Sequence, residues 1–274
     1  MMIDEQIIKK CELAAKQMRL DAITATYQVG NTGAHIGGTL SMIEIMAALY
    51  VGVMNLSPEN LKSPTRDRFI LSKGHGVLAQ YVALKQIGVI LPEELQTFKQ
   101  NGTRLYAHPS RNADIGIEFS SGSLGQGVSL AVGVALALKK KGNPARVYVL
   151  VGDGECDEGS VWEALASASH FGLDNLTVIV DKNALQYDGE TDTILSMNSL
   201  SQKFEAFGFD TQELDGHSVE KLLYAFQKPS DRPKAIVANT VKGKGVSFME
   251  GNALWHNGKL SEKQYIQAIE EASV

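Results

Sequence analysis

The sequence predicts an α/β fold in which helices flank both faces of a parallel sheet. Short runs of β-branched and apolar residues alternate with longer runs in which apolar residues recur at helical spacing. No run reaches the roughly 18 apolar residues of a membrane span. A chain of 274 residues, 44% of them apolar, is long enough to bury one large core. We therefore expect residues 1–274 to form a single domain.

The chain opens with two predicted helices. The first runs from Ile3 to about Gln28, and the second begins at Ser41, where Ser41 and Glu44 have the spacing of a capping box. Apolar residues recur at helical spacing in the first of them, at Ile7, Ile8, Cys11, Ala14, Ala15 and Met18.

Strands and helices then alternate along the chain. The predicted strands are 68–72, 146–151, 176–181, 208–214 and 234–241. The predicted helical segments are 76–88, 124–140, 158–170, 199–207 and 218–227. Such alternation favours a parallel sheet covered on both faces. Residues 101–122 form a long irregular connection, which in a compact domain is more often a binding loop than slack chain.

Composition narrows the class of protein. The net charge of −5 and the absence of a Lys/Arg block argue against nucleic acid as a partner. Cys11 and Cys156 are too few for a disulfide framework and too far apart for a CxxC metal motif, so we expect a reducing, cytoplasmic setting, with Cys11 in the core. The charged amino terminus lacks the apolar segment of a signal peptide, and we expect no membrane partner.

The stretch "GDGECDEGSVWEALASASHFGLDNLTVIVDKN" places Asp153 after one predicted strand and Asn183 after the next. The carboxyl ends of parallel strands meet at one edge of a sheet, where open α/β sheets bind ligands, so the two side chains can meet. Carboxylate and amide oxygens suit Mg²⁺, which is commonly shared with substrate phosphates. Gly152 and Gly154 let the backbone approach such phosphates. The residues alone leave a second reading open, in which Asp153 caps a helix and Asn183 makes a turn.

The whole segment from Gly152 through "NALQYDG" resembles the transketolase family, and its GDG followed by Asn is the signature of thiamine diphosphate (ThDP) enzymes. The resemblance implies a ThDP-binding fold and a bound Mg²⁺, or Ca²⁺ or Mn²⁺ in its place. It implies that Asp153, Asn183 and the carbonyl of Leu185 bind the metal. It also places Gly152, Gly154 and Glu155 at the cofactor.

Further segments resemble the family in order along the chain. In "GNTGAHIGGTL", where Ile36 replaces a proline of the family, the resemblance implies that His35 lies beside the substrate. "RDRFILSKGHG" implies a diphosphate contact for His75, and "YAHPS" a substrate contact for His108. The looser match "WHNG" implies that His256 contacts diphosphate and substrate.

Two more matches complete the implied site. "GSLGQG", in which Ser123 replaces a proline, implies that backbone at Gly122 and Leu124 holds the pyrimidine side of the cofactor. The family places at Glu158 a carboxylate that links cofactor sites across a subunit interface. The two remaining histidines are expected to be structural, His170 at the end of a helix and His217 as an N-terminal helix residue.

The resemblance covers the amino-terminal, diphosphate-binding portion of a transketolase, and no pyrimidine-binding portion follows. We therefore expect a split enzyme in which this chain pairs with a carboxy-terminal subunit carrying the pyrimidine-binding domain, as a heterotetramer. The implied reaction moves a two-carbon ketol unit from a ketose or its phosphate to an aldose or its phosphate.

Other functions stay open at this point. The chain could serve another ThDP enzyme, such as a deoxyxylulose-phosphate synthase or a 2-oxo-acid dehydrogenase. The latter shares the GDG and Asn but lacks "RDRFILSKGHG" and "GSLGQG". A non-catalytic, cofactor-binding partner subunit is the remaining alternative.

Overall fold

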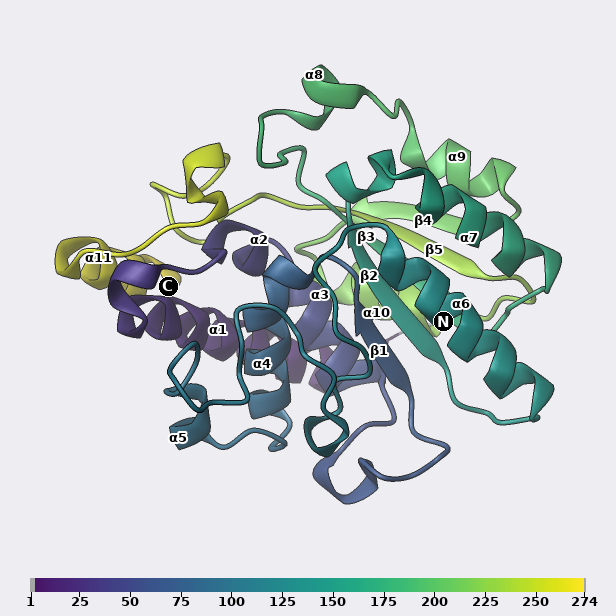
Figure 1. Cartoon of the computed structure of the whole chain (residues 1–274), viewed down its shortest axis with the longest axis horizontal. Coiled ribbons are helices and arrows are strands. Elements are labelled where there is room, and N and C mark those ends of the chain that lie inside the picture. Colours follow the sequence, from purple (N-terminus) through teal and green to yellow (C-terminus); the bar gives the residue numbers. More distant parts are fainter. Residues whose placement is uncertain (1–2, 274) are drawn as a thin grey trace.

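Five parallel strands form one sheet in the computed structural model, which describes residues 3–273 (Figure 1). Their order across the sheet is β1-β2-β3-β5-β4. The strands are β1 (Arg68–Leu71), β2 (Val147–Gly152), β3 (Leu176–Lys182), β4 (Asp210–Asp215) and β5 (Lys234–Asn239). The predicted parallel sheet is confirmed, and each strand lies within two residues of its predicted bounds.

Helices cover both faces of this sheet, as predicted. On one face pack α1 (Glu5–Gln28), α3 (Ile43–Ala47), α4 (Val77–Gln86), α10 (Val219–Gln227) and α11 (Glu262–Ala272). On the other pack α6 (Gln126–Lys140), α7 (Gly159–His170) and α9 (Leu200–Ala206) (Figure 1). The short helices are α2 (Ile36–Leu40), α5 (Pro92–Leu95) and α8 (Thr191–Leu195).

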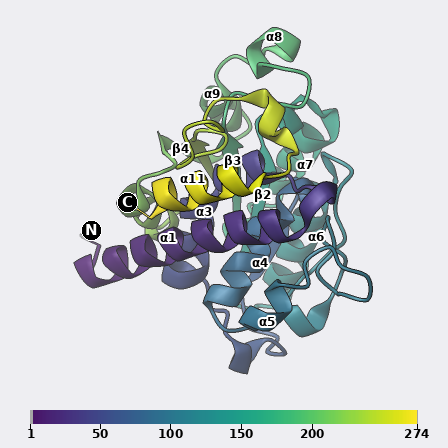
Figure 2. The same cartoon turned by 90° about the vertical axis from the view of Figure 1, so that its left-hand side faces the viewer.

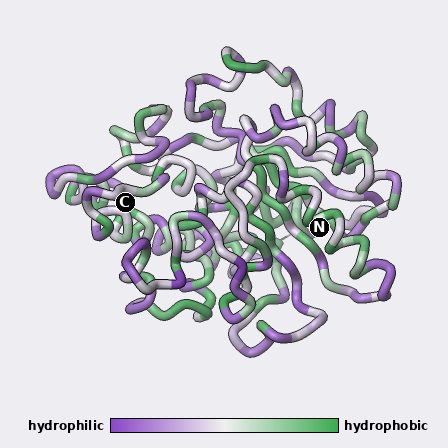
Figure 3. The backbone as a smooth tube through the Cα atoms, in the orientation of Figure 1, coloured by the Kyte–Doolittle hydropathy of each residue, from purple (hydrophilic) through white to green (hydrophobic). Residues whose placement is uncertain are grey.

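The central strands supply side chains to two separate cores. Along β2, Tyr148 and Leu150 join the core under α1 and α4, whereas Val147, Val149 and Val151 join the core under α6 and α7. This is the period of two expected of a strand, and because both faces are buried the strand reads as a continuous apolar run. Figure 3 shows the apolar centre of the sheet surrounded by hydrophilic loops.

The first and last helices of the chain, α1 and α11, lie side by side on one side of the sheet. Figure 2 shows α11 lying beside α1. The Tyr27 and Tyr265 rings stack with centroids 4.3 Å apart. Asp4 caps α1 by accepting a hydrogen bond from the Gln6 amide at 2.9 Å. Within residues 3–273, no helix combines the length and the apolar character needed to cross a membrane.

The structure corrects one helix start. Ser41 does not form the predicted capping box with Glu44, because its hydroxyl donates to the buried Asp181 at 2.6 Å. Ser41 instead ends α2, and α3 begins two residues later at Ile43. A π-helical turn over Ala48–Val53 then continues from α3.

A buried ion pair joins the carboxyl ends of two strands. Lys73 follows β1 and pairs with Asp181 near the end of β3, with side chains 2% and 0% exposed. Asp181 also accepts hydrogen bonds from Ser41, Thr240 and Asn183. Its four partners therefore come from four different segments of the chain.

Removing Lys73 should be costly for stability. Lys73→Met leaves Asp181 buried without its counter-charge, so we expect the free energy of unfolding to fall by about 3–5 kcal/mol in urea titrations. Asp181→Asn in the Lys73→Met background should recover part of this loss. Breaking the exposed Lys139–Asp174 pair with Lys139→Met should cost no more than about 1 kcal/mol. Equal losses for Lys73→Met and Lys139→Met would contradict the role of the buried pair.

Candidate active site

A cavity of about 300 Å³ lies at the carboxyl ends of β2 and β3. Ten of the thirteen site residues singled out from the sequence line it. They are His75, Leu124, Gly152, Asp153, Gly154, Glu155, Glu158, Asn183, Leu185 and His256. The other three lie outside its lining. His35 lies next to His75 and His256, His108 lies next to His35, and Gly122 lies next to His108.

Asp153 connects the two loops that the sequence predicted to meet. Gly152 pairs in register with Asp181, so β2 and β3 end together. One oxygen of the Asp153 carboxylate accepts from the Gly154 amide at 2.9 Å, and the other accepts from the Ala184 amide at 2.6 Å. Ala184 has a φ of 61°, and its bond to Asp153 holds this left-handed turn in place. The GDG loop and the Asn183 loop thus form one wall.

Asn183 and Leu185 supply neutral oxygens to that wall. The Asn183 amide nitrogen donates to Asp181 at 3.2 Å, while its oxygen accepts from the Leu185 amide at 3.2 Å. The Leu185 carbonyl accepts from Lys242 Nζ at 2.9 Å. A carbonyl has two lone pairs, so this bond leaves one for another ligand.

The electrostatics of Asp153 favour a cation. Burial, and next the negative charge of Asp181, raise the pKa of Asp153 to about 6. A bound cation would relieve both effects. One carboxylate with two neutral oxygens, facing a cavity built on glycine turns, fits a Mg²⁺ ion shared with a diphosphate.

Glu155 has a structural part in the site. Its carboxylate accepts from the Ser72 hydroxyl, from the Gly125 amide at 2.8 Å and from the Gly152 amide at 3.1 Å. These bonds tie the loops after β1 and β2 to the start of α6. Glu155 also lines the cavity, as expected, but its oxygens are engaged by the protein.

Four histidines from distant segments form one cluster. The centroid of the His35 ring lies 5.5 Å from those of His75 and His108, and 5.4 Å from that of His256. The His75 and His256 centroids are 5.1 Å apart. A Cβ placed on Gly122 would lie 3.3 Å from the His108 ring, so glycine allows this close approach.

These histidines are neutral near pH 7. Burial, followed by nearby positive or histidine groups, lowers the pKa of His75 to about 2 and those of His35 and His256 to about 4. Burial also lowers the pKa of His108. Among the described residues, no group of three or more His, Cys, Asp or Glu side chains is arranged to hold a metal. The cluster therefore suits hydrogen bonding by neutral rings better than metal binding.

Two lysines of the site were missed by the sequence reasoning. Lys73 and Lys242 both line the cavity and both are 2% exposed. Lys242 Nζ contacts the Leu185 carbonyl and also lies 3.1 Å from His256 Nδ1. Burial, and then the charge of Lys73, lower the pKa of Lys242 to about 8. The sequence pattern that could have pointed to these two lysines is a lysine directly before a glycine, in "SKGHG" and "VKGKG".

The remaining predicted residues lie at the edge of the site or away from it. Glu158 is exposed on the cavity rim, directly before α7. His170 ends α7 as predicted and is exposed. His217 is not a helix residue, because α10 begins at Val219 and Ser218 caps it. Cys11 is fully buried in the core, as expected.

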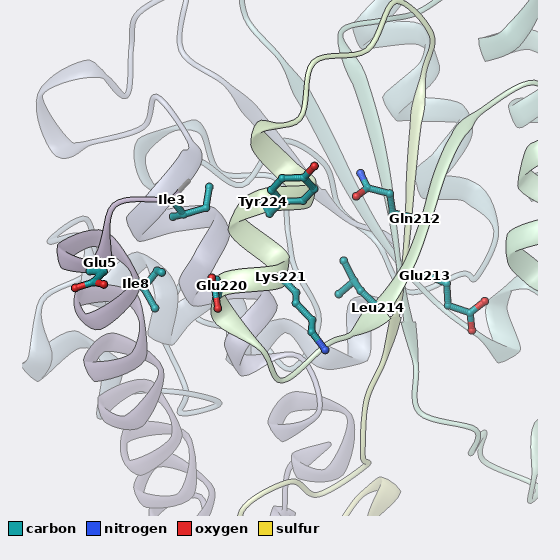
Figure 4. A pocket seen from close by; sticks show the side chains of 9 residues that line it. All are labelled: Ile3, Glu5, Ile8, Gln212, Glu213, Leu214, Glu220, Lys221 and Tyr224. Carbon is teal, nitrogen blue, oxygen red and sulfur yellow. The ribbon is translucent and has the colours of Figure 1, made fainter. Parts of the chain in front are cut away.

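A larger hollow of about 750 Å³ lies elsewhere, between the start of α1, α10 and the edge strand β4 (Figure 4). In Figure 4, Ile3 and Ile8 lie on one side and Tyr224 and Leu214 on the other. It contains no histidine and none of the predicted site residues. The chemistry therefore identifies the smaller cavity as the candidate site.

Comparisons with known proteins show the family to which the chain belongs. Residues 10–272 match the family described as "Transketolase, thiamine diphosphate binding domain". One relative, from Phocaeicola vulgatus, is named as one of the subunits of an apulose-4-phosphate transketolase. It is 38% identical over 269 residues, which cover 97% of this chain and 95% of the relative. Another relative, from a Clostridium species, is named 6-deoxy-6-sulfo-D-fructose transketolase subunit SqwG. It is 42% identical over 248 residues, which cover 89% of this chain and 90% of the relative.

Longer transketolases match the chain over part of their length. Human transketolase is 36% identical over 269 residues, which cover 98% of this chain but 43% of the human protein. The crystal structure of transketolase from Campylobacter jejuni superposes with a TM-score of 0.84 at 29% identity, again covering 98% of this chain and 43% of that one. The family match, the relatives and the shared fold together establish that this chain belongs to the transketolase family and has the fold of its ThDP-binding domain.

Proposed function

We propose that this chain is the diphosphate-binding subunit of a split transketolase that moves a two-carbon ketol unit between sugars or sugar phosphates. The observation that carries the proposal is the cavity itself, where Asp153, Asn183 and the Leu185 carbonyl lie beside neutral histidines. Two relatives of similar length are named as transketolase subunits, one for apulose 4-phosphate and one for 6-deoxy-6-sulfo-D-fructose. These names support a role for this chain in acting on a ketose or its phosphate.

Each part of the cavity has a proposed task. Asp153, Asn183 and Leu185 hold Mg²⁺, or Ca²⁺ or Mn²⁺ in its place. Gly152 and Gly154 let the backbone approach the diphosphate. When bound, ThDP supplies the carbanion chemistry that amino-acid side chains lack.

The basic groups share the remaining work. Lys242 lies against Leu185 and His256 and offsets the diphosphate charge, with His75 as a second contact to that group. His35, His108 and His256 donate and accept hydrogen bonds to substrate hydroxyls. Because their pKa values are depressed, they enter the reaction neutral, with one ring nitrogen able to donate and the other able to accept a hydrogen bond.

The half-open site supports a partner subunit. Large apolar side chains are exposed near the cavity: Tyr187 on its lining is 73% exposed, and Leu254, two residues from His256, is 85% exposed. Leu195 of α8, which stands away from the sheet in Figure 1, is 51% exposed. Large apolar side chains exposed beside a site are typical of an interaction surface. We propose that a second polypeptide carrying the pyrimidine-binding domain covers it, with Glu158 near the contact, in a heterotetramer.

The metal clamp is tested by substitution. Asp153→Ala removes the one anionic oxygen of the three, so we expect Mg²⁺-dependent ThDP affinity to fall by more than about 100-fold in calorimetry. Asn183→Ala should cost less, about 10-fold, because water can replace a neutral ligand. Asp231→Ala, at an exposed position in the loop before β5, is the matched control and should change nothing. An unchanged affinity for Asp153→Ala would rule out the clamp.

The histidines should separate into two roles. His35→Ala and His108→Ala should lower kcat with ketose donors by about 10²- to 10⁴-fold, the range for lost acid–base groups, while ThDP affinity stays near wild type. His75→Ala should mainly weaken ThDP binding. Steady-state kinetics and calorimetry on the assembled enzyme distinguish the roles. An equal loss of ThDP in all three variants would indicate a general folding role instead.

Activity should require a second chain. The purified chain alone should show no ketol transfer. Among its described residues, we propose contacts to the pyrimidine side of the cofactor only for backbone at Gly122 and Leu124. Mixing with a pyrimidine-domain subunit, ThDP and Mg²⁺ should restore activity, and light scattering should give two copies of each polypeptide. Full activity from this chain by itself would overturn the split-enzyme proposal.

A further inference from the structure

His217 lies outside the candidate site but is bonded on both sides of its ring. Nδ1 lies 2.9 Å from the Glu44 carboxylate, and Nε2 lies 2.8 Å from the backbone nitrogen of Val241. The side chains of His217 and Glu44 are only 14% and 12% exposed. His217 precedes α10, Glu44 belongs to α3 and Val241 follows β5, so the ring joins three separate segments.

The network assigns the proton of this ring. The Glu44 carboxylate can only accept, so Nδ1 donates to it, and the Val241 amide can only donate, so Nε2 accepts. Arg19 holds the other oxygen of Glu44 at 2.5 Å, and its Nε donates to the Lys244 carbonyl at 3.0 Å. A neutral ring with a fixed tautomer thus receives the Val241 N–H.

The residue after Val241 is Lys242, which reaches into the cofactor cavity. Lys242 Nζ lies 2.9 Å from the Leu185 carbonyl and 3.1 Å from His256 Nδ1. The residues on either side of Val241 and Lys242 are also anchored, since Thr240 donates to Asp181 and the Gly243 amide donates to the Gly37 carbonyl at 3.0 Å. The bond to His217 is the side-chain anchor of Val241 itself.

We propose that His217 is a positioning residue, which fixes the backbone at Val241 so that Lys242 lies against Leu185 and His256. The inference rests on the proposed function for its consequence, because Lys242 would then be held ready for the diphosphate. His217 itself touches neither cofactor nor substrate. Its effect passes through one backbone hydrogen bond.

Two isosteric variants separate the two bonds of the ring. His217→Gln can place an amide oxygen near the position of Nε2 and keep an acceptor for Val241. His217→Asn ends near the position of Nδ1, so it keeps a donor to Glu44 but loses the acceptor. His170→Asn, at the exposed end of α7, is the matched control. Thermal melts would establish that all three variants fold.

The first measurement needs no cofactor. Reductive methylation of Lys242, followed by peptide mass spectrometry on the full chain, reports how firmly this buried amine is held. We expect labelling to be about tenfold faster in His217→Asn, and within about twofold of wild type in His217→Gln and His170→Asn. Equal labelling in His217→Asn and wild type would overturn the inference. So would equal acceleration in His217→Gln and His217→Asn, since that would indicate packing alone.

The second measurement adds ThDP and Mg²⁺. Calorimetry should give about tenfold weaker binding for His217→Asn, equivalent to about 1.4 kcal/mol, with affinity restored in His217→Gln. Wild-type affinity in His217→Asn would overturn the link between His217 and the cofactor. A wild-type chain that binds no ThDP, even with its partner, would instead overturn the proposed function, and the methylation rates would still decide the role of His217.

Discussion

The buried carboxylate of Asp181 is the constraint on which the site depends. It accepts hydrogen bonds from Lys73 after β1, Ser41 after α2, Thr240 after β5 and Asn183 after β3. A charge with no exposed surface is tolerated only when it is paired and hydrogen-bonded, so these four segments must converge at one point. The need to pair the buried charge of Asp181 therefore holds these segments together beside the cavity.

This convergence explains the chemistry of the neighbouring groups. The negative charge of Asp181, together with burial, raises the pKa of Asp153 and prepares it for a cation. The positive charges of Lys73 and Lys242 help to lower the pKa values of His75 and His256. One edge of the sheet thus brings carboxylate and carbonyl oxygens together with neutral imidazoles. Because these charged side chains are buried, their charges interact more strongly than they would in water.

The two sides of the cavity differ in their contacts. The side at the strand ends is held by buried polar bonds, such as those of Glu155 to Ser72 and Gly125. The opposite side ends in exposed apolar residues, among them Tyr187 and Leu254. This exposed side is where we propose that the second polypeptide packs.

The sequence by itself determined the α/β class, the alternation of strands and helices, and the segments that carry the site. These features are local, since periodicity, glycine turns and histidine-bearing motifs are all written in contiguous residues. It also placed Asp153 and Asn183 correctly at one edge, because consecutive parallel strands share a direction. The pairing of β4 with β5 at the sheet edge, the meeting of four histidines, and the use of Ser41 by Asp181 were decided only by tertiary structure. Lys73 and Lys242 were missed for the same reason: their partners lie far away in sequence, and a buried polar group takes whichever partner the fold brings within reach.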